Sequence, residues 1–201
     1  MSFAKPFFLS LALISAGASS AYAESQIAIF AGGCFWCIEK DFEHVKGVED
    51  VVSGYTGGES DNPTYKNHVA AKHLEAVKIT YDPAVVSYET LLNTFWRTVD
   101  PTDAGGQFCD RGHSYTTAVF AVDDMQRKLA EASKGEAQAA LGKPIVTSIR
   151  DAAPFYDAED YHQNYYEKNP VRYNYYRTAC GRNRTVEKLW GEAAYQGVDG
   201  H

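Results

Sequence analysis

Hydrophobic and polar positions along this chain follow strand-like and helix-like patterns in turn from residue 26 onward. The segment Glu75 to Tyr81 alternates strictly, with Val77, Ile79 and Tyr81 on one side, which is typical of a strand. Ser87 stands before a run with helical spacing and is a suitable N-cap. Further patterns predict strands over 26–31, 51–55, 115–122 and 145–150, and helices over 34–45, 87–98, 124–141, 158–167 and 185–194. Strands separated by helices indicate one α/β or α+β domain.

A pair of glycines follows the first predicted strand and precedes a helix that starts with a cysteine. Gly32 and Gly33 end the strand, and from Cys34 onward Phe35 and Ile38 share one helical face. Cys34 therefore lies at or near a helix N-terminus, where free amide N–H groups stabilise an anion. We expect this position to lower the pKa of the Cys34 thiol and make it a nucleophile. The alternative is a buried structural cysteine.

The first 23 residues have the features of an export signal. Lys5 precedes an apolar run over residues 7–16, and Ala21-Tyr22-Ala23 fits the pattern read by signal peptidase. The run is shorter than the about 20 apolar residues that a membrane span needs, and the other interpretation is a buried N-terminal helix. Cleavage after Ala23 predicts a mature domain over 24–201, exported to a periplasm and not stably associated with the membrane.

Composition and charge narrow the class of protein. Of the 201 residues, 45% are hydrophobic and 22% charged, which is typical of a globular protein and not of a disordered chain. Lys and Arg number 19 against 26 Asp and Glu, and a net charge of −7 argues against a nucleic-acid binder. The composition and net charge are compatible with an enzyme or with a binding module. We expect the protein to be a monomer.

Four cysteines lie after the predicted signal: Cys34, Cys37, Cys109 and Cys180. In an exported chain they allow two structural disulfides, with three possible pairings. The spacing of Cys34 and Cys37 is also the CxxC of zinc sites and thiol redox sites. Zinc is disfavoured because the other two cysteines stand alone and the six histidines form no HxxxH pair, so we expect no metal.

A series of short motifs runs in order along the chain, and the first is Gly33-Cys34-Phe35-Trp36 with Glu39. The other segments, in order, are 54–58 with 62–65, 73–77, 81–83 with 95–96, 108–115, and 154–156 with 158–163. Together they resemble the peptide methionine sulfoxide reductase A family, whose active-site signature is similar to the first motif. The resemblance runs from about residue 28 to about residue 170. It implies a compact α+β domain with a ferredoxin-like core, in which helices flank a mixed sheet, and an irregular C-terminal tail from about residue 170.

The resemblance implies peptide-methionine (S)-S-oxide reductase activity, the reduction of protein-bound or free methionine S-sulfoxide to methionine. Cys34 would attack the sulfoxide sulfur, and Glu75, kept protonated by burial, would protonate the oxygen. Taken alone, Glu75 could also be a solvated residue that opens a strand. Phe35 and Trp36 resemble the aromatic residues that receive the S-methyl group, and their alternative role is core packing.

Three other residues are candidates to support the sulfoxide oxygen, and one of them, Asp110, matches the position of a supporting carboxylate in the family. Tyr55 and Tyr115 would donate hydrogen bonds to it, because a phenol keeps its proton at neutral pH. Asp110 would orient its neighbours through hydrogen bonds.

The reaction implied by the resemblance leaves Cys34 as a sulfenic acid, which condenses with a second thiol. Cys180, in the predicted tail, is the first candidate for this resolving cysteine. Cys37 stands where the better-known pattern has glycine, and it is the second candidate, as a relay. Cys109 is either buried and structural or paired with Cys180. A thioredoxin-like protein would reduce the resulting disulfide, and no bound cofactor is expected.

Two other functions fit parts of the sequence. A general thiol–disulfide oxidoreductase would use the CxxC motif and leave Glu75, Tyr55 and Tyr115 without a catalytic task. A binding module would use the four cysteines as two structural disulfides. The order of the motifs and the matched residue roles favour the sulfoxide reductase.

Overall fold

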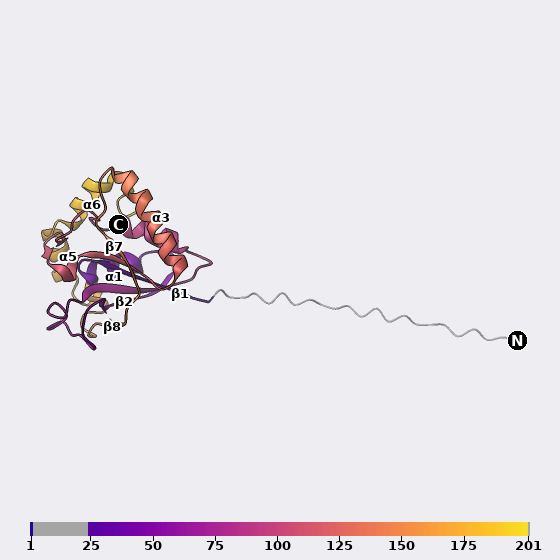
Figure 1. Cartoon of the computed structure of the whole chain (residues 1–201), viewed down its shortest axis with the longest axis horizontal. Coiled ribbons are helices and arrows are strands. Elements are labelled where there is room, and N and C mark those ends of the chain that lie inside the picture. Colours follow the sequence, from indigo (N-terminus) through magenta and orange to yellow (C-terminus); the bar gives the residue numbers. More distant parts are fainter. Residues whose placement is uncertain (2–23, 201) are drawn as a thin grey trace.

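A mixed six-stranded sheet forms the centre of the computed structural model, which describes Met1 and residues 24–200 (Figure 1). The predicted export signal thus lies outside the described residues. The strand order is β7-β6-β1-β3-β2-β8, and only β6 and β7 run parallel. The strands are β1 Gln26–Gly32, β2 Val48–Thr56, β3 Leu74–Tyr81, β6 Thr117–Ala121, β7 Ser148–Asp151 and β8 Phe155–Asp157. β4 Gly106–Gln107 and β5 Asp110–Arg111 form a separate two-stranded ribbon.

Three helices pack on one face of this sheet: α1 Phe35–Glu43, α2 Tyr88–Trp96 and α3 Asp124–Leu141. On β3, Val77, Ile79 and Tyr81 join the core under these helices, whereas Leu74 and Ala76 belong to a smaller cluster. The predicted alternation of this strand is therefore confirmed. The same two-residue period places Glu75 on the helix-covered face, which decides its environment.

The starts of two helices follow from their capping residues. The Ser87 hydroxyl accepts a hydrogen bond from the Thr90 amide at 3.2 Å, and the Asp123 carboxylate accepts one from the Gln126 amide at 2.7 Å. Each bond satisfies an amide that has no partner within the helix, so both predicted starts are confirmed.

The connection from β1 to α1 depends on one glycine. Gly33 has a φ of 82°, and a Cβ atom at this position would approach the Gln107 Cβ to 2.5 Å. Both the left-handed backbone and the close contact require glycine, so the chain can turn sharply and begin α1 directly after Cys34.

The C-terminal part is helical, so the expectation of an irregular tail is wrong. It contains α4 Tyr165–Lys168, α5 Pro170–Ala179 and α6 Arg182–Trp190, and Figure 1 shows α5 and α6 against the body of the domain. Arg177 of α5 and Arg182 of α6 are buried and interact with Asp41 of α1. Local periodicity does not reveal this docking, because arginines on a short helix are usually exposed.

The helix predicted over 158–167 is also wrong in extent, since residues 160–164 form turns before the single turn of α4. The described residues also contain two one-turn 3-10 helices, η1 His113–Tyr115 and η2 Gly191–Ala193. Within residues 24–200, no helix has the length and apolar character to cross a membrane.

Candidate active site

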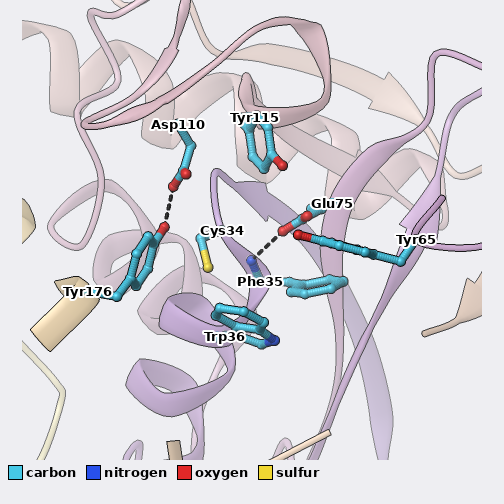
Figure 2. Close-up of a pocket in the computed structure, with 8 residues that line it drawn as sticks. All are labelled: Cys34, Phe35, Trp36, Tyr65, Glu75, Asp110, Tyr115 and Tyr176. Atoms are coloured by element: carbon cyan, nitrogen blue, oxygen red, sulfur yellow. Dashed lines mark hydrogen bonds between the residues drawn. The ribbon is translucent and has the colours of Figure 1, made fainter. Parts of the chain in front are cut away.

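A pocket opens above the N-terminus of α1, and the glycine turn, β3, the β5 ribbon and α5 all contribute to it. Figure 2 shows the eight side chains that line it, with the Cys34 sulfur among them. Six of the eight were predicted as site residues from the sequence. The lining residues are Cys34, Phe35, Trp36, Tyr65, Glu75, Asp110, Tyr115 and Tyr176.

Glu75 supplies the acid of this pocket. Its side chain is only 2% exposed, and its Oε2 accepts a hydrogen bond of 3.1 Å from the Phe35 amide at the start of α1. Burial raises the pKa of Glu75 to about 8, with a smaller contribution from the negative charge of Asp110. The carboxyl group is therefore mostly protonated at neutral pH and can donate a proton. The alternative of a solvated Glu75 is excluded.

Cys34 precedes α1 as its N-cap residue and is 6% exposed. Burial raises the pKa of its thiol well above the usual value, and the hydrogen bond and charge of Cys37 raise it further. The predicted lowering of this pKa is therefore wrong for the resting site. The reason is local: Glu75, and not the Cys34 sulfur, accepts from the first amide of α1.

Cys37 is the thiol that favours its ionised form. It lies on the first turn of α1 and is 1% exposed. Although burial opposes ionisation, the hydrogen bond from Cys34 and the charges of Arg182 and Arg177 lower the pKa of Cys37 to about 6. The two neighbouring sulfurs thus share one proton at neutral pH.

The tyrosines of the pocket differ from the predicted pair. Tyr115 lines the pocket near the Glu75 carboxyl group, and its hydroxyl slightly opposes the rise in the pKa of Glu75 that burial causes. Tyr55 is fully buried and donates instead to Glu159 at 2.9 Å, so its predicted role as a direct donor to substrate oxygen is wrong. Tyr65 lines the pocket in its place.

Tyr65 and Tyr176 are the lining residues that sequence reasoning missed. Tyr65 belongs to a motif that carried the family resemblance, so the sequence contained a signal for this residue. Tyr55 lies at the end of a predicted strand, whereas Tyr65 does not lie near one. Tyr176 lies on α5, beyond the end of the family resemblance at about residue 170, and only the docking of α5 brings it to the pocket.

Phe35 and Trp36 form an aromatic wall of the pocket. Phe35 is also buried in the main core, so core packing and a place in the pocket wall are compatible for this residue. Trp36 stacks on Tyr165 with a centroid distance of 3.8 Å, and its Nε1 donates to His162 Nδ1 at 3.1 Å. A wall held on two sides in this way presents a rigid apolar surface beside the Cys34 sulfur.

Asp110 lies on the side of the pocket opposite the aromatic wall, and a disulfide lies next to it. Asp110 accepts a hydrogen bond from the Tyr176 hydroxyl, as Figure 2 shows, so it does orient a neighbour of the pocket. Next to it, Cys109 forms a disulfide with Cys180, 71 residues away. This bond ties the β5 ribbon to the end of α5.

The disulfide answers one question that the sequence left open, namely the partner of Cys109. Cys109 pairs with Cys180, but it is exposed and not buried. Cys180, the first candidate for the resolving cysteine, has no free thiol in this state. Cys34 and Cys37 are the free thiols of the chain. Among residues 24–200, no group of three His, Cys, Asp or Glu side chains could hold a metal ion.

The chain is similar to known proteins over most of its length. The family model described as peptide methionine sulfoxide reductase matches residues 26–194. The chain is similar to peptide methionine sulfoxide reductase MsrA 2 of Rhizobium meliloti (strain 1021), with 57% identity over 176 residues, 88% of this chain and 89% of the relative. It is also similar to peptide methionine sulfoxide reductase MsrA of Bacillus subtilis (strain 168), with 54% identity over 172 residues, 84% of this chain and 97% of the relative.

Solved structures with the same fold include two forms of a yeast protein. Reduced Mxr1 from Saccharomyces cerevisiae has a TM-score of 0.70 and 32% identity, covering 79% of this chain and 93% of that one. Methionine sulfoxide reductase A of Corynebacterium diphtheriae has a TM-score of 0.65 and 30% identity, covering 73% and 76%. Mxr1 in complex with Trx2 has a TM-score of 0.53 and 27% identity, covering 77% and 94%.

Proposed function

Since this chain belongs to the peptide methionine sulfoxide reductase family, and is an MsrA-type enzyme that reduces methionine sulfoxide, we propose that Cys34 and Glu75 carry out the reduction together. The Cys34 sulfur attacks the sulfoxide sulfur while Glu75 gives its proton to the oxygen. The S–O bond breaks, methionine leaves, and Cys34 becomes a sulfenic acid. The burial of Glu75, with its pKa of about 8, is the observation that carries this proposal.

Substrate placement follows from the walls of the pocket. The S-methyl group lies against Phe35 and Trp36, where apolar contact is favourable, and the hydroxyls of Tyr65 and Tyr115 donate to the oxygen. An apolar wall on one side and hydroxyl donors on the other can accept only one of the two epimers of the sulfoxide. We assign the S epimer, as the family resemblance implies.

The Cys34 sulfenic acid is resolved by Cys37, because Cys37 is the neighbouring free thiol. The sulfenic oxygen leaves as water when the Cys34–Cys37 disulfide forms. This bond is buried, so a reducing protein cannot reach it directly. The exposed Cys109–Cys180 disulfide is the entry point for electrons: a thioredoxin-like protein reduces it, and Cys180 then exchanges with the buried pair. The complex of Mxr1 with Trx2 supports a thioredoxin as the donor.

A coupled assay tests the sulfoxide step. Purified protein with thioredoxin, thioredoxin reductase and NADPH should oxidise NADPH with methionine S-sulfoxide and not with the R epimer. Cys34→Ser should abolish this turnover. Full turnover in that variant would exclude the mechanism.

Mass spectrometry after one turnover without reductant tests the route through the cysteines. A Cys34–Cys37 disulfide alongside an unchanged Cys109–Cys180 bond is expected. A Cys34–Cys180 bond would instead support Cys180 as the resolving thiol and contradict our assignment.

Export is a separate part of the proposal. The apolar run over 7–16 and the Ala21-Tyr22-Ala23 site direct the chain to the periplasm, where it acts as a monomer. The exposed Cys109–Cys180 disulfide supports this location, because such bonds persist in oxidising compartments. N-terminal sequencing of the protein from a periplasmic fraction should begin at Glu24, and gel filtration should give the monomer mass. An uncleaved cytoplasmic protein would contradict the export proposal.

A further inference from the structure

A buried histidine lies next to the acid of the pocket, on the segment of chain that joins β2 to β3. His68 is 1% exposed and Glu75 is 2% exposed. The His68 Nε2 atom lies 3.8 Å from Glu75 Oε1, whereas Glu75 Oε2 is the oxygen that accepts from the Phe35 amide. The two carboxyl oxygens of Glu75 therefore have different neighbours, and His68 is the neighbour of Oε1.

The contact made by the other ring nitrogen determines where His68 carries its proton. Nδ1 lies 3.0 Å from the backbone carbonyl oxygen of Tyr65. A carbonyl oxygen only accepts hydrogen bonds, so Nδ1 is the nitrogen that carries the proton. Burial lowers the pKa of His68, so the ring is neutral at neutral pH, and Nε2 then has a lone pair and no proton.

The Nε2 atom of His68 has no hydrogen-bond partner among the described residues, although it is buried. A buried acceptor without a partner costs free energy, and a protonated Glu75 carboxyl group would supply the missing donor. The separation of 3.8 Å is longer than a hydrogen bond. Such contacts in active sites are often long in the free enzyme and shorten when the substrate binds.

Two tyrosine rings hold the His68 ring in place. Tyr55 stacks on it with a centroid distance of 4.8 Å, and Tyr65 stacks on it with a centroid distance of 5.7 Å. Glu159 fixes both tyrosines, because its carboxylate accepts from the Tyr55 hydroxyl at 2.9 Å and from the Tyr65 amide at 3.0 Å. Packing that is complete before any substrate binds therefore keeps Nε2 beside Glu75.

We propose that His68 is a positioning residue for the sulfoxide step: its Nε2 accepts a hydrogen bond from the Glu75 carboxyl group and keeps the proton there until the sulfoxide oxygen takes it. The inference rests on the proposed function and deepens it. A hydrogen bond to the neutral carboxyl group disfavours ionisation of that group, and a lone pair repels the carboxylate. His68 acts through Glu75, since His68 does not itself line the pocket.

Protons and electrons balance with His68 in this role. The Glu75 proton moves to the sulfoxide oxygen, the S–O bond breaks, and the oxygen ends on Cys34 as a sulfenic acid. The sulfoxide sulfur gains two electrons and the Cys34 sulfur loses two. The thiol proton lost by Cys34 matches the proton given up by Glu75, which is reprotonated through solvent. His68 begins and ends the cycle with one proton, on Nδ1.

The test follows the titration of Glu75, so the titratable groups around the pair must stay the same. Those that interact with Glu75 or His68 are Cys34 at the start of α1, Cys37 of α1, Tyr55 of β2, Tyr65 and His73 of the segment before β3, Asp110 of β5, Tyr115 of η1, and Glu159 and His162 of the segment before α4. Substitutions at position 68 alone leave all of them in place.

Two substitutions separate the roles of the two ring nitrogens. Asn has a donor near the place of Nδ1, so His68→Asn keeps the bond to the Tyr65 carbonyl and removes the acceptor beside Glu75. Gln reaches the place of Nε2, so His68→Gln keeps that acceptor and loses the bond to Tyr65. In the resting protein, ¹³C NMR of the labelled Glu75 carboxyl group gives its ionisation against pH. His68→Asn should lower the midpoint by on the order of one pH unit, about tenfold in the equilibrium, and His68→Gln should leave it close to wild type.

Two controls assign the signal and its origin. The transition should disappear in Glu75→Gln, which identifies the carboxyl group. His44 is a matched histidine, because its Nδ1 also lies close to a backbone carbonyl oxygen, that of Lys40 at 2.8 Å, but it does not line the pocket. His44→Asn should leave the Glu75 midpoint and the turnover unchanged. Single-turnover rates give a second reading, since their decline at high pH should begin at lower pH in His68→Asn than in wild type.

The ring proton is tested in the wild-type protein, so the proposal does not depend on the folding of a variant. The ¹⁵N chemical shifts of the His68 ring should show a proton on Nδ1 and none on Nε2. A proton on Nε2, an unchanged midpoint in His68→Asn, or an equal fall in His68→Gln would overturn the proposal. None of these NMR measurements uses substrate. Turnover in Cys34→Ser would therefore refute the proposed function and leave the pairing of His68 with Glu75 intact, whereas an unmoved midpoint would refute only the pairing.

Discussion

Replacing Glu75 with Gln removes the proton donor of the pocket with almost no change in size. The side-chain carbonyl of the introduced amide can still accept from the Phe35 amide, which Glu75 contacts at 3.1 Å. Because burial raises the pKa of Glu75 to about 8, roughly nine molecules in ten carry the proton at pH 7. General acid catalysis contributes about 10²- to 10⁴-fold, so we expect the sulfoxide step of Glu75→Gln to slow by about that factor.

The same substitution should stabilise the folded protein. In the unfolded chain Glu75 ionises near 4.5, whereas in the folded chain it ionises only near 8. The stability contributed by this group is therefore complete below pH 4.5 and is lost as pH rises through 8. At about 1.4 kcal/mol per pKa unit, the loss is roughly 3 to 5 kcal/mol near pH 8 as an upper limit. Gln does not ionise and avoids this loss.

Two assays separate the effects, and the chain offers a matched control. Single-turnover rates with methionine S-sulfoxide should decline above pH 8 in wild type and be low and flat in Glu75→Gln. Urea unfolding should give the variant a stability advantage that grows between about pH 5 and about pH 8.

Glu39→Gln is the control, because Glu39 is also fully buried and burial raises its pKa to about 8, but it does not line the pocket. It should gain stability in the same way and keep its turnover. A wild-type rate in Glu75→Gln, or an equal loss of rate in Glu39→Gln, would refute the reasoning.

Four other substitutions test the cysteines and the tyrosines. Cys37→Ser should leave the Cys34 sulfenic acid unresolved after one turnover, detectable as a dimedone adduct, and thioredoxin-driven recycling should fail; a normal recycling rate would contradict this. Cys180→Ser removes the disulfide between two cysteines that are 71 residues apart. It should lower the free energy of unfolding by up to about 4 kcal/mol, measured by urea unfolding. Tyr65→Phe should lower kcat/KM for the sulfoxide, whereas Tyr55→Phe should cost about 1 kcal/mol of stability by losing its bond to a carboxylate, with a much smaller effect on the chemical step. The reverse pattern would restore the sequence-based choice of tyrosine.

Local patterns were sufficient for much of the fold and for the position of Cys34, whereas the role of Glu75 was implied by the family resemblance. The alternation along β3 predicted which of its residues face the helices, and it puts Glu75 among them. The glycine pair before Cys34 predicted the end of β1 ahead of a helix, and Ser87 predicted the start of α2. These features depend on neighbours a few residues apart, whose geometry is the same in any fold, so they can be recognised without knowing the rest of the molecule.

Contacts between distant segments decided what those patterns could not. The ionisation of Cys37 depends on Arg177 and Arg182, about 140 residues further along, and the disulfide joins cysteines 71 residues apart. Tyr176 reaches the pocket only because buried arginines dock α5 on α1. The charge state of a buried thiol is set by every dipole and charge within a few ångströms in a medium that screens poorly, and chain folding alone determines which groups those are.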